Sequence, residues 1–526
     1  MLPTSAVALA EIEGLDALAQ SLARSNAAVA TAHGQFLEAR RSVADQLARV
    51  GRALAMLDGS AFDDLVLPAL PSVAVPTLPG PAVAEAPREL TLPDLSGGVP
   101  RSFDRAALLR HASGKLSEVF GPTFADQDGF EPRTRMPEPP LLLCSRVLTV
   151  EGEPGVLGPS RIVTEYDLPT DASWSHHDGK PNACVIVESG QADLFLVSFL
   201  GIESHCRGER VYRLLDCDLT FQGPRPSVGE TLHHDIRIKR FARLGGTILF
   251  YFEYDCTSNT DGRPVLQMRN GCAGFFTPGE LATPHGVDAR PEPLATPPAP
   301  VRPRLTTTVR SLDEDGVQAL VDGRFSAAFG PGFAPADGSR LTLPDSEWRL
   351  VHRIHEVRTD GGPYGLGLAR TEQVLRDDDW FNPCHFKGDP CMPGTLMLEG
   401  CLQVVQTWML GAGVAADHPD GLFEPLPGLP FELRCRGQVV PGHSSLVYEA
   451  RVKEARLDGD APYAIADVLL SVDGTPVVLA KNVGVTVGLR AGGARRVLPE
   501  PAPTEAPARV EPEPVVDVRR VYEYSI

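Results

Sequence analysis

Hydrophobic and polar residues alternate along several segments in both halves of the chain. The clearest segments are residues 233–241, 247–256, 445–455 and 463–474, in which apolar positions recur every second residue. This period predicts antiparallel strands with one buried face and one solvated face. Residues 395–410 are instead apolar on nearly every side, which predicts a buried helix. The chain is therefore predicted to have an α+β fold of antiparallel sheets and buried helices.

The two halves of the chain also resemble each other. LSEVFGPTFADQDG in the first half corresponds to FSAAFGPGFAPADG in the second. The offset between matched residues is steady, at 353 − 146 = 207 for Arg146 and Arg353 and 372 − 165 = 207 for Glu165 and Glu372. A constant offset over many residues indicates a duplicated unit, which we call the first copy and the second copy. Because these Arg and Glu residues recur in both copies, we expect a structural ion pair.

Three proline-rich segments without hydrophobic period frame the two copies and are typical of extended linkers. The predicted boundaries are a helical linker segment at 1–60, a Pro-rich linker at 61–99, the first copy at 100–290, a Pro-rich linker at 291–304, the second copy at 305–495 and a Pro-rich C-terminal linker at 496–526.

Charge and cysteine content narrow the class of partner. The net charge of −19, from 68 acidic and 49 basic residues, argues against nucleic acid or an anionic membrane as the main partner. Ten cysteines lack the spacing of a disulfide framework, which favours reduced thiols and a cytoplasmic location. No basic leader and no apolar run of about 18 residues is present, so we expect a chain that does not cross a membrane.

Residues 384–399, CHFKGDPCMPGTLMLE, combine groups that suit acid–base chemistry. His385 precedes a turn of small residues, and Pro393 lies at the start of the predicted buried helix. The amino end of that helix offers N–H groups to an oxygen that gains negative charge. Glu399 lies inside the apolar helix, where desolvation raises a carboxyl pKa and suits it to donate a proton.

Together these groups suit removal of a proton α to a thioester carbonyl with loss of a β-hydroxyl group. The alternative is that His385 is a satisfied loop residue and that Glu399 pairs with an arginine. Two nearby cysteines, Cys384 and Cys391, lack the base expected beside a nucleophile, and no further ligands suggest a metal.

The segment HFKGDPCMPGTLMLEGCLQ resembles the active-site motif HFxGDPxMPGxLxxD/E of FabA/FabZ-type β-hydroxyacyl-ACP dehydratases, including the gap of 399 − 385 = 14 residues between histidine and acid. That family has a hot-dog fold, an antiparallel sheet wrapped around a central helix. The resemblance therefore implies a double hot-dog. The tandem copies with Pro-rich flanks resemble the dehydratase region of a bacterial polyunsaturated fatty acid (PUFA) synthase.

The resemblance also assigns roles to residues of the second copy. It implies that His385 is the base, that Glu399 occupies the acid position and that the amides around Gly394 and Thr395 polarise the carbonyl. Gly388 and Pro393 belong to the turn that precedes the helix. The motif is compatible with both branches of the family, so isomerisation of the new double bond stays open.

In this family the histidine of one hot-dog works with the acid of its neighbour, so the first copy matters. Aligning Pro181 with Pro393 places Val187 opposite Glu399, with Glu188 one residue further along. One residue is about 100° around a helix, although a local bulge restores the direction. The first copy also lacks HFxGDP and is predicted to be degenerate. Glu188 is the second candidate for the acid paired with His385.

The predicted activity is dehydration of 3-hydroxyacyl chains on acyl carrier protein to trans-2-enoyl products, with no cofactor and no metal. Other megasynthase domains are expected partners, and the two copies are expected to form a dimer-like pair within one chain, with a homodimer also open. RCRGQV (434–439) is either a basic spot for the carrier protein or a solvated strand edge. The alternative functions are a hot-dog acyl thioesterase and a non-catalytic module that binds acyl carriers.

Overall fold

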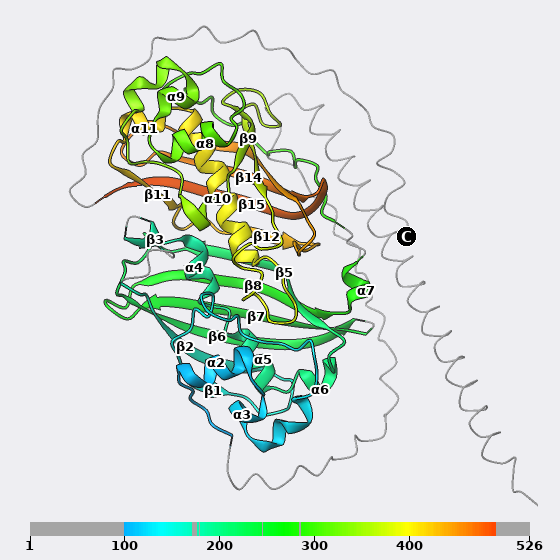
Figure 1. The fold of residues 1–526 in the computed structure, drawn as a ribbon. Helices are drawn as coiled ribbons and strands as arrows, with labels where there is room; N and C mark the ends of the chain where they lie inside the picture. Colours follow the sequence, from blue (N-terminus) through cyan, green and yellow to red (C-terminus); the bar gives the residue numbers. More distant parts are fainter. Residues whose placement is uncertain (1–98, 171–175, 178, 245, 283–285, 491–526) are drawn as a thin grey trace, which may run out of the picture. The chain divides into compact units, whose positions relative to one another are not determined.

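The computed structural model describes residues 99–170, 176–177, 179–244, 246–282 and 286–490 (Figure 1). All of them fall within one compact unit of the chain, Leu92–Ile526. The predicted segments 1–60 and 496–526, and the linker 61–99 apart from Val99, lie outside the described residues. Among the described residues, no helix is long and apolar enough to cross a membrane.

The first copy contains several short helices and a run of long strands. Its helices are α2 (Arg105–Ser113), α3 (Ser117–Phe120), α4 (Ala183–Glu188), α5 (Asp193–Phe199), α6 (Glu203–Cys206) and α7 (Pro278–Leu281). Its strands are β1 (Arg146–Glu151), β2 (Ser160–Asp167), β3 (His176–His177), β4 (Lys180–Pro181), β5 (Val211–Phe221), β6 (Thr231–Leu244), β7 (Thr247–Ser258) and β8 (Pro264–Phe276).

The second copy follows the same plan, with one long helix. Its helices are α8 (Glu314–Val321), α9 (Phe325–Phe329), α10 (Gly394–Gly411) and α11 (Val414–Asp417). Its strands are β9 (Arg353–Arg358), β10 (Leu368–Val374), β11 (Gly421–Pro425), β12 (Phe431–Cys435), β13 (Ser445–Arg456), β14 (Tyr463–Val472) and β15 (Thr475–Leu489).

The strands of both copies join in one thirteen-stranded sheet, with the order β1-β2-β6-β7-β8-β5-β12-β15-β14-β13-β10-β9 and β11 paired to β15. The seam between the copies is the antiparallel pair of β5 and β12, in which Leu219 lies opposite Phe431. Strand β12 is therefore central, and the interpretation of 434–439 as a strand edge is wrong. Figure 1 shows the two copies side by side along this seam.

The central helix of each copy is packed inside its sheet. Every residue of α10 from Thr395 to Gly411 is buried, and the helix contacts β9, β10, β13, β14 and β15. A Cβ on Gly400 would lie 2.3 Å from the ring of Tyr448, so only glycine allows this approach. Gly190 faces Tyr254 in the same way in the first copy, at 2.7 Å. The predicted α+β double hot-dog fold is confirmed.

The central helix of the first copy is interrupted, whereas a single buried helix was predicted. Helix α4 ends at Glu188, and α5 starts at Asp193. Between them, the amides of Gly190 and Gln191 bond to carbonyls three residues earlier, those of Val187 and Glu188. Such bonds tighten the last turn of a helix and change the direction of its side chains. Glu188 lies at this change.

The outer faces of the two sheets differ. Strand β7 alternates strictly between buried and half-buried residues, as its pattern predicted. Strand β14 is buried on both faces, so the half-buried prediction for 463–474 is wrong. The segment after the first copy covers this face, because Ala289 accepts a hydrogen bond from Arg451 at 2.6 Å and Glu292 pairs with Lys481.

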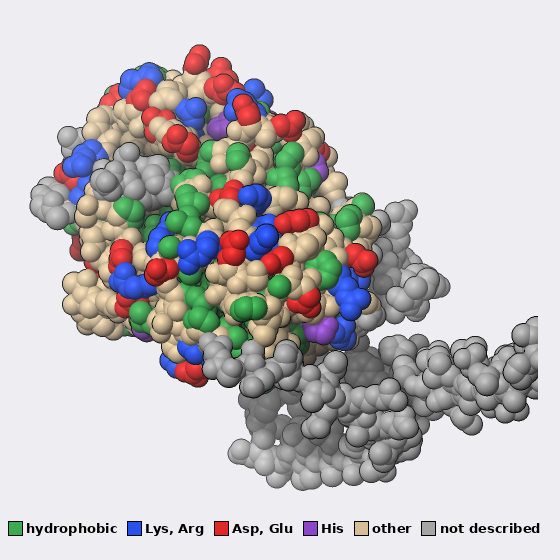
Figure 2. Space-filling model, turned by 60° about the horizontal axis from the view of Figure 1, so that its bottom comes forward, with side chains coloured by type: hydrophobic (Ala, Val, Ile, Leu, Met, Phe, Trp, Pro, Cys, Tyr) green, Lys and Arg blue, Asp and Glu red, His purple; other side chains and the backbone are tan. Residues whose placement is uncertain are grey.

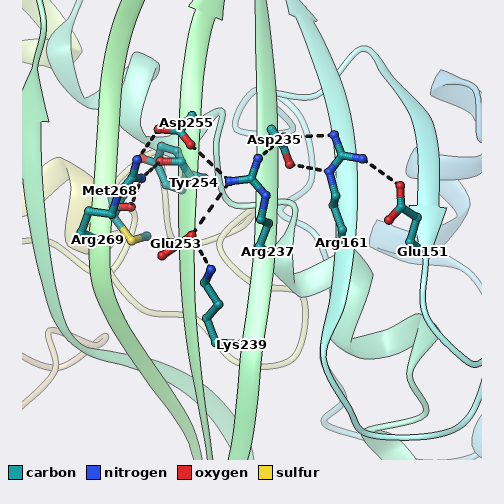
Figure 3. A network of polar contacts seen from close by, with 10 residues as sticks. All are labelled: Glu151, Arg161, Asp235, Arg237, Lys239, Glu253, Tyr254, Asp255, Met268 and Arg269. Atoms are coloured by element: carbon teal, nitrogen blue, oxygen red, sulfur yellow. Dashed lines mark hydrogen bonds and ion pairs between the residues drawn. The ribbon is translucent and has the colours of Figure 1, made fainter.

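The outer face of the first copy instead carries a charge ladder, which we define as the ion-paired residues of β1, β2, β6, β7 and β8 drawn in Figure 3. Arg161 on β2 pairs with Glu151 at 2.8 Å and with Asp235 at 2.7 Å. Arg237 continues the ladder to Asp255 at 3.3 Å. Figure 2 shows acidic and basic side chains interspersed over the visible face. The recurring ion pair is confirmed in both copies, at 2.6 Å for Arg146–Glu165 and 3.5 Å for Arg353–Glu372.

Candidate active site

His385 lies in the loop between β10 and α10 and is 7% exposed. Its Nδ1 donates to the carbonyl oxygen of Cys391 at 2.8 Å. A carbonyl only accepts, so this bond fixes the proton on Nδ1 and leaves Nε2 as the basic nitrogen. Burial lowers the pKa of His385 to about 4; the bond to Cys391 opposes this shift, and the positive charge of Arg213 adds to it. The ring is therefore neutral at physiological pH.

Glu188 of the first copy is the carboxyl group beside this ring. Its Oε1 lies 3.9 Å from Nε2 of His385, and its side chain is 5% exposed. The hydroxyl of Thr395 donates to Oε2 at 2.6 Å. Burial raises the pKa of Glu188 to about 7, against the opposing effect of the Thr395 bond. Near neutral pH the site thus holds a neutral imidazole and a carboxyl group that is partly protonated.

The amino end of α10 meets these two groups. Pro393 caps the helix, and the amides of Leu396 and Met397 make the first bonds inside the helix, both to the carbonyl of Pro393. The amides of Gly394 and Thr395 precede this ladder, at the positive end of an eighteen-residue helix.

The predicted turn residue Gly388 has φ of 80°, a left-handed conformation that favours glycine. Its place on the exposed side of the loop makes it a turn residue rather than a lining residue.

Two cavities meet at Glu188. The first is lined by His385, Gly394 and Glu188 together with Tyr212, Arg213, Leu214, Phe386, Met392, Met397 and Gln438, among others. The second, on the other side, is mainly apolar and includes Leu141, Leu143, Trp348 and Trp380, with Glu188 and Thr395 again in its wall. The bonded pair Glu188–Thr395 therefore lies between the cavity of His385 and the cavity of the two tryptophans. A larger cavity, between residues 294–304 and β13 and β14, contains none of the predicted site residues.

Glu399 lies in a different place. It is 3% exposed, and its carboxylate accepts a bond from the amide of Cys184 at 3.2 Å. It lines a separate small cavity with Asn182, Arg225 and Gln406. Burial raises its pKa, and Arg225 opposes this. The structure brings His385 to Glu188 and not to Glu399.

The relation between the copies explains this placement. The start of each central helix faces the neighbouring copy, so the carboxyl of each helix meets the loop of the other. Glu399 meets the first copy at Asn182, and the described residues that line its cavity include no histidine. The alignment of Pro181 with Pro393 is one residue off, because the N-cap of α4 is Asn182 whereas that of α10 is Pro393. Glu188 and Glu399 each lie six residues beyond their N-cap (188 − 182 = 6 and 399 − 393 = 6). We call the cavity at Glu399 the vestigial site.

Several groups near His385 were not predicted from the sequence. Arg213 on β5 bonds both carboxylate oxygens of Asp389, at 2.6 and 2.8 Å. Tyr212 donates to Asp193 at 3.3 Å, and burial raises the pKa of Asp193 to about 7. Asp389 stands in the HFKGDP motif, but its partner comes from a strand about 176 residues earlier. No local sequence pattern identifies an ion pair between segments so far apart in the chain.

The described residues do not favour a metal-binding site or a reactive thiol beside His385. They contain no group of three or more His, Cys, Asp or Glu side chains placed to hold a metal ion. Cys391 lies 3.6 Å from His385 Nδ1, but burial raises its pKa to about 12, so it stays a thiol. Arg434 and Arg436, in the predicted basic spot, pair with Glu432 and Asp216.

The chain is also similar to known proteins. Residues 343–481 match the family model of the FabA-like domain. The match lies within the second copy, and the resemblance to FabA-type dehydratases is confirmed. Over 407 residues, or 73% of this chain, the protein is 40% identical to a polyunsaturated fatty acid synthase subunit from Thraustochytrium sp.. The chain spans 26% of the length of that relative.

The solved structures that this chain resembles are distant. A MaoC-like dehydratase is 11% identical, with a TM-score of 0.33, over 64% of this chain and 99% of its own. The dehydratase domain of PpsC from Mycobacterium tuberculosis is 13% identical, with a TM-score of 0.30, over 63% of this chain and 94% of its own. TM-scores this low add nothing to the assignment.

Proposed function

We propose that this chain removes water from 3-hydroxyacyl thioesters and forms trans-2-enoyl thioesters. The observation that carries the proposal is the pairing of a neutral histidine with a partly protonated glutamic acid, 3.9 Å apart at the start of a long helix. Dehydration needs one group that accepts a proton from C2 and another that donates a proton at C3. The site offers one of each.

In the proposed reaction, Nε2 of His385 takes the proton from C2, and the electron pair of that C–H bond moves toward the thioester carbonyl. The amides of Gly394 and Thr395 stabilise the negative charge on the carbonyl oxygen. The C3–O bond then breaks, the C2–C3 double bond forms and Glu188 protonates the departing hydroxyl to give water. Return of the proton from His385 to Glu188 restores both groups, which lie close enough for transfer through one water molecule.

The two cavities suggest how the substrate lies. The thioester and its carrier arm would occupy the cavity beside His385, where Tyr212 and Gln438 offer polar groups. The acyl chain would continue past Glu188 into the apolar cavity at Trp348 and Trp380. Glu188 and Thr395 form the boundary between the two cavities, which is where C3 must lie.

Partners and setting follow from the relatives rather than from this chain alone. We propose acyl carrier protein as the substrate carrier and other domains of a PUFA-type synthase as neighbours, because the relative that this chain matches is part of a polyunsaturated fatty acid synthase. The sheet seam joins the copies without a second chain, so a homodimer is not needed to complete the site. The ten cysteines are buried and form no disulfide bonds, which agrees with a cytoplasmic setting.

A direct assay tests the proposal. Incubation with a 3-hydroxyacyl thioester, on carrier protein and on a small pantetheine mimic, should produce the absorbance of the conjugated enoyl thioester, and His385→Ala should abolish it. Release of free thiol without that absorbance would instead indicate a thioesterase. No reaction with either substrate would indicate a non-catalytic carrier-binding module. Analysis of the product's double-bond position would show whether isomerisation follows.

A further inference from the structure

The loop that carries His385 is attached to the first copy by a half-buried ion pair. Arg213 on β5 holds Asp389 through two parallel bonds of 2.6 and 2.8 Å, and its Nε donates to Gln438 at 2.8 Å. The side chains of Arg213 and Asp389 are 13% and 17% exposed. A fork of this kind fixes both distance and orientation, because the guanidinium and carboxylate planes must align.

The turn between Asp389 and His385 transmits this position to the ring. Phe386 and Asp389 exchange backbone bonds of 3.0 Å in both directions. The amide of Cys391 donates to the carbonyl of His385 at 2.8 Å, and the Cys391 carbonyl accepts from the His385 ring at 2.8 Å. The ring is thus tied to a closed turn whose charged anchor to the first copy is Asp389. The turn also meets the first copy where the amide of Glu138 donates to the carbonyl of Cys384 at 2.8 Å and Lys387 donates to the carbonyl of Ser113 at 3.2 Å.

Arg213 also contributes charge to the site. It lines the same cavity as His385 and lowers the pKa of the ring, as a nearby positive charge does. The other titratable groups around the ring are Glu188 on α4, Cys391 and Asp389 on the loop itself, and Tyr212 with Asp193 behind Glu188. Among these, Arg213 is the cation.

We propose that Arg213 is a positioning residue that the first copy supplies to the base of the second copy. It holds the turn of His385 at the distance from Glu188 that proton transfer requires, and its charge helps to keep the ring neutral. The inference rests on the proposed dehydration. It gives the degenerate copy a second contribution to the site, besides the carboxyl of Glu188.

The test compares Arg213→Gln and Arg213→Lys in the full chain. Arg213→Gln should lower kcat by about 10- to 100-fold with a smaller change in KM, since a shift of about 1 Å at a catalytic group costs up to about 100-fold. It should also move the acidic limb of the kcat/KM profile to higher pH, by roughly one unit, because a positive charge beside His385 is lost. Arg213→Lys keeps the positive charge but cannot make two parallel bonds to Asp389. Its kcat should therefore fall, while the acidic limb of the kcat/KM profile stays at the same pH.

Arg436 provides a matched control. It makes a bidentate pair across the same seam, with Asp216 at 2.9 and 3.1 Å, but its side chain does not line the cavity of His385. Arg436→Gln should leave kcat within about threefold of the parent, since the lost pair shares no partner with the loop of His385. Equal losses in Arg436→Gln and Arg213→Gln would mean that Arg213 only holds the seam together, and would overturn the proposal.

Two further measurements distinguish a failure of the role given to Arg213 from a failure of the proposed dehydration. Arg213→Gln/Asp389→Asn should be no slower than Arg213→Gln alone, because both changes remove the same interaction. NMR titration of the His385 ring, assigned with His385→Ala, should show a raised pKa in Arg213→Gln without any turnover. An unshifted ring with full activity would refute the inference, whereas an inactive parent with a shifted ring would refute dehydration and leave the positioning role of Arg213 intact.

Discussion

The two copies contribute different parts of the proposed active site. The second copy keeps the histidine turn and the uninterrupted helix α10, whereas the first keeps Glu188 and Arg213 and has lost the turn. The vestigial site at Glu399 is the complementary remainder, with a buried acid and no histidine among the described residues that line it. Two symmetric hot-dogs would carry two equivalent sites. The difference teaches that a duplicated fold needs only one complete set of groups, provided that the seam between the copies stays rigid.

The outer faces show a second difference. The sheet of the first copy exposes the charge ladder, whereas residues 286–304 lie over the sheet of the second. Charges on the covered face are accordingly buried. Asp467 is 8% exposed and accepts bonds from Lys453 at 2.6 Å and from the amide of Asn482 at 3.0 Å. An ion pair of this kind therefore contributes a different amount to the free energy of unfolding in the two copies.

The largest expected effect distinguishes the two buried acids. Glu188→Gln should lower kcat by roughly 100- to 10,000-fold, the usual contribution of a general acid, because glutamine cannot donate the proton. Glu399→Gln should change kcat by less than about threefold, since Glu399 lines a separate cavity. Steady-state rates of enoyl formation measure both. The reverse order would show that Glu399 is the working acid and that His385 moves to it during turnover.

The pH profile of the parent sharpens the same comparison. His385 must be neutral and has a pKa of about 4, and Glu188 must be protonated and has a pKa of about 7. We expect kcat/KM to rise as pH increases through about 4 and to fall as pH increases through about 7. Glu399→Gln should keep both limbs. A basic limb that disappears in Glu399→Gln would contradict the assignment to Glu188.

The next effect concerns the buried ion pair that closes the vestigial site. Arg225 of the first copy pairs with Glu424 of the second at 2.8 Å, and the two side chains are 7% and 8% exposed. Glu424→Gln leaves the arginine buried without its counter-charge and should destabilise the chain by about 3–5 kcal/mol. Urea unfolding measures the loss, and activity per folded molecule should persist. A proportionate loss of activity at full stability would show that the vestigial site takes part in catalysis.

The fold and the histidine could be predicted from the sequence, but the whole site could not. Strand alternation, the repeat offset and the HFKGDP motif are local or periodic signals, and they predicted the double hot-dog and His385. The acid stayed undecided between Glu188 and Glu399, because the choice depends on the residue at which α4 starts and on which loop of the other copy each carboxyl meets. Arg213 was missed for a related reason: its partner Asp389 meets it only through pairing of distant strands. Burial of β14 likewise depends on a linker that folds back.

A smaller effect separates function from stability at Glu188. Its folded pKa of about 7 is above the ordinary 4.5, so between these values the folded chain holds a proton that the unfolded chain has released. Stability from this group is full below about pH 4.5 and declines as pH rises through 7. Glu188→Gln removes that dependence and should be more stable than the parent by up to about 3 kcal/mol at pH 8, and by almost nothing at pH 4. Thermal unfolding at the two pH values checks this, and equal gains at both would contradict it.

The smallest effect tests the two outer faces against each other. Arg237 in the charge ladder is 35% exposed, so water and salt screen its pairs, and Arg237→Gln should cost less than about 1 kcal/mol. Asp467→Asn on the covered face should cost more, about 1–3 kcal/mol, because Lys453 and the Asn482 amide lose a charged acceptor where water does not replace it. Urea unfolding at low and high salt measures both, and only the Arg237 variant should approach the parent as salt increases. Equal costs that respond equally to salt would mean that residues 286–304 do not shield the second sheet, and the contrast between the two faces would then be lost.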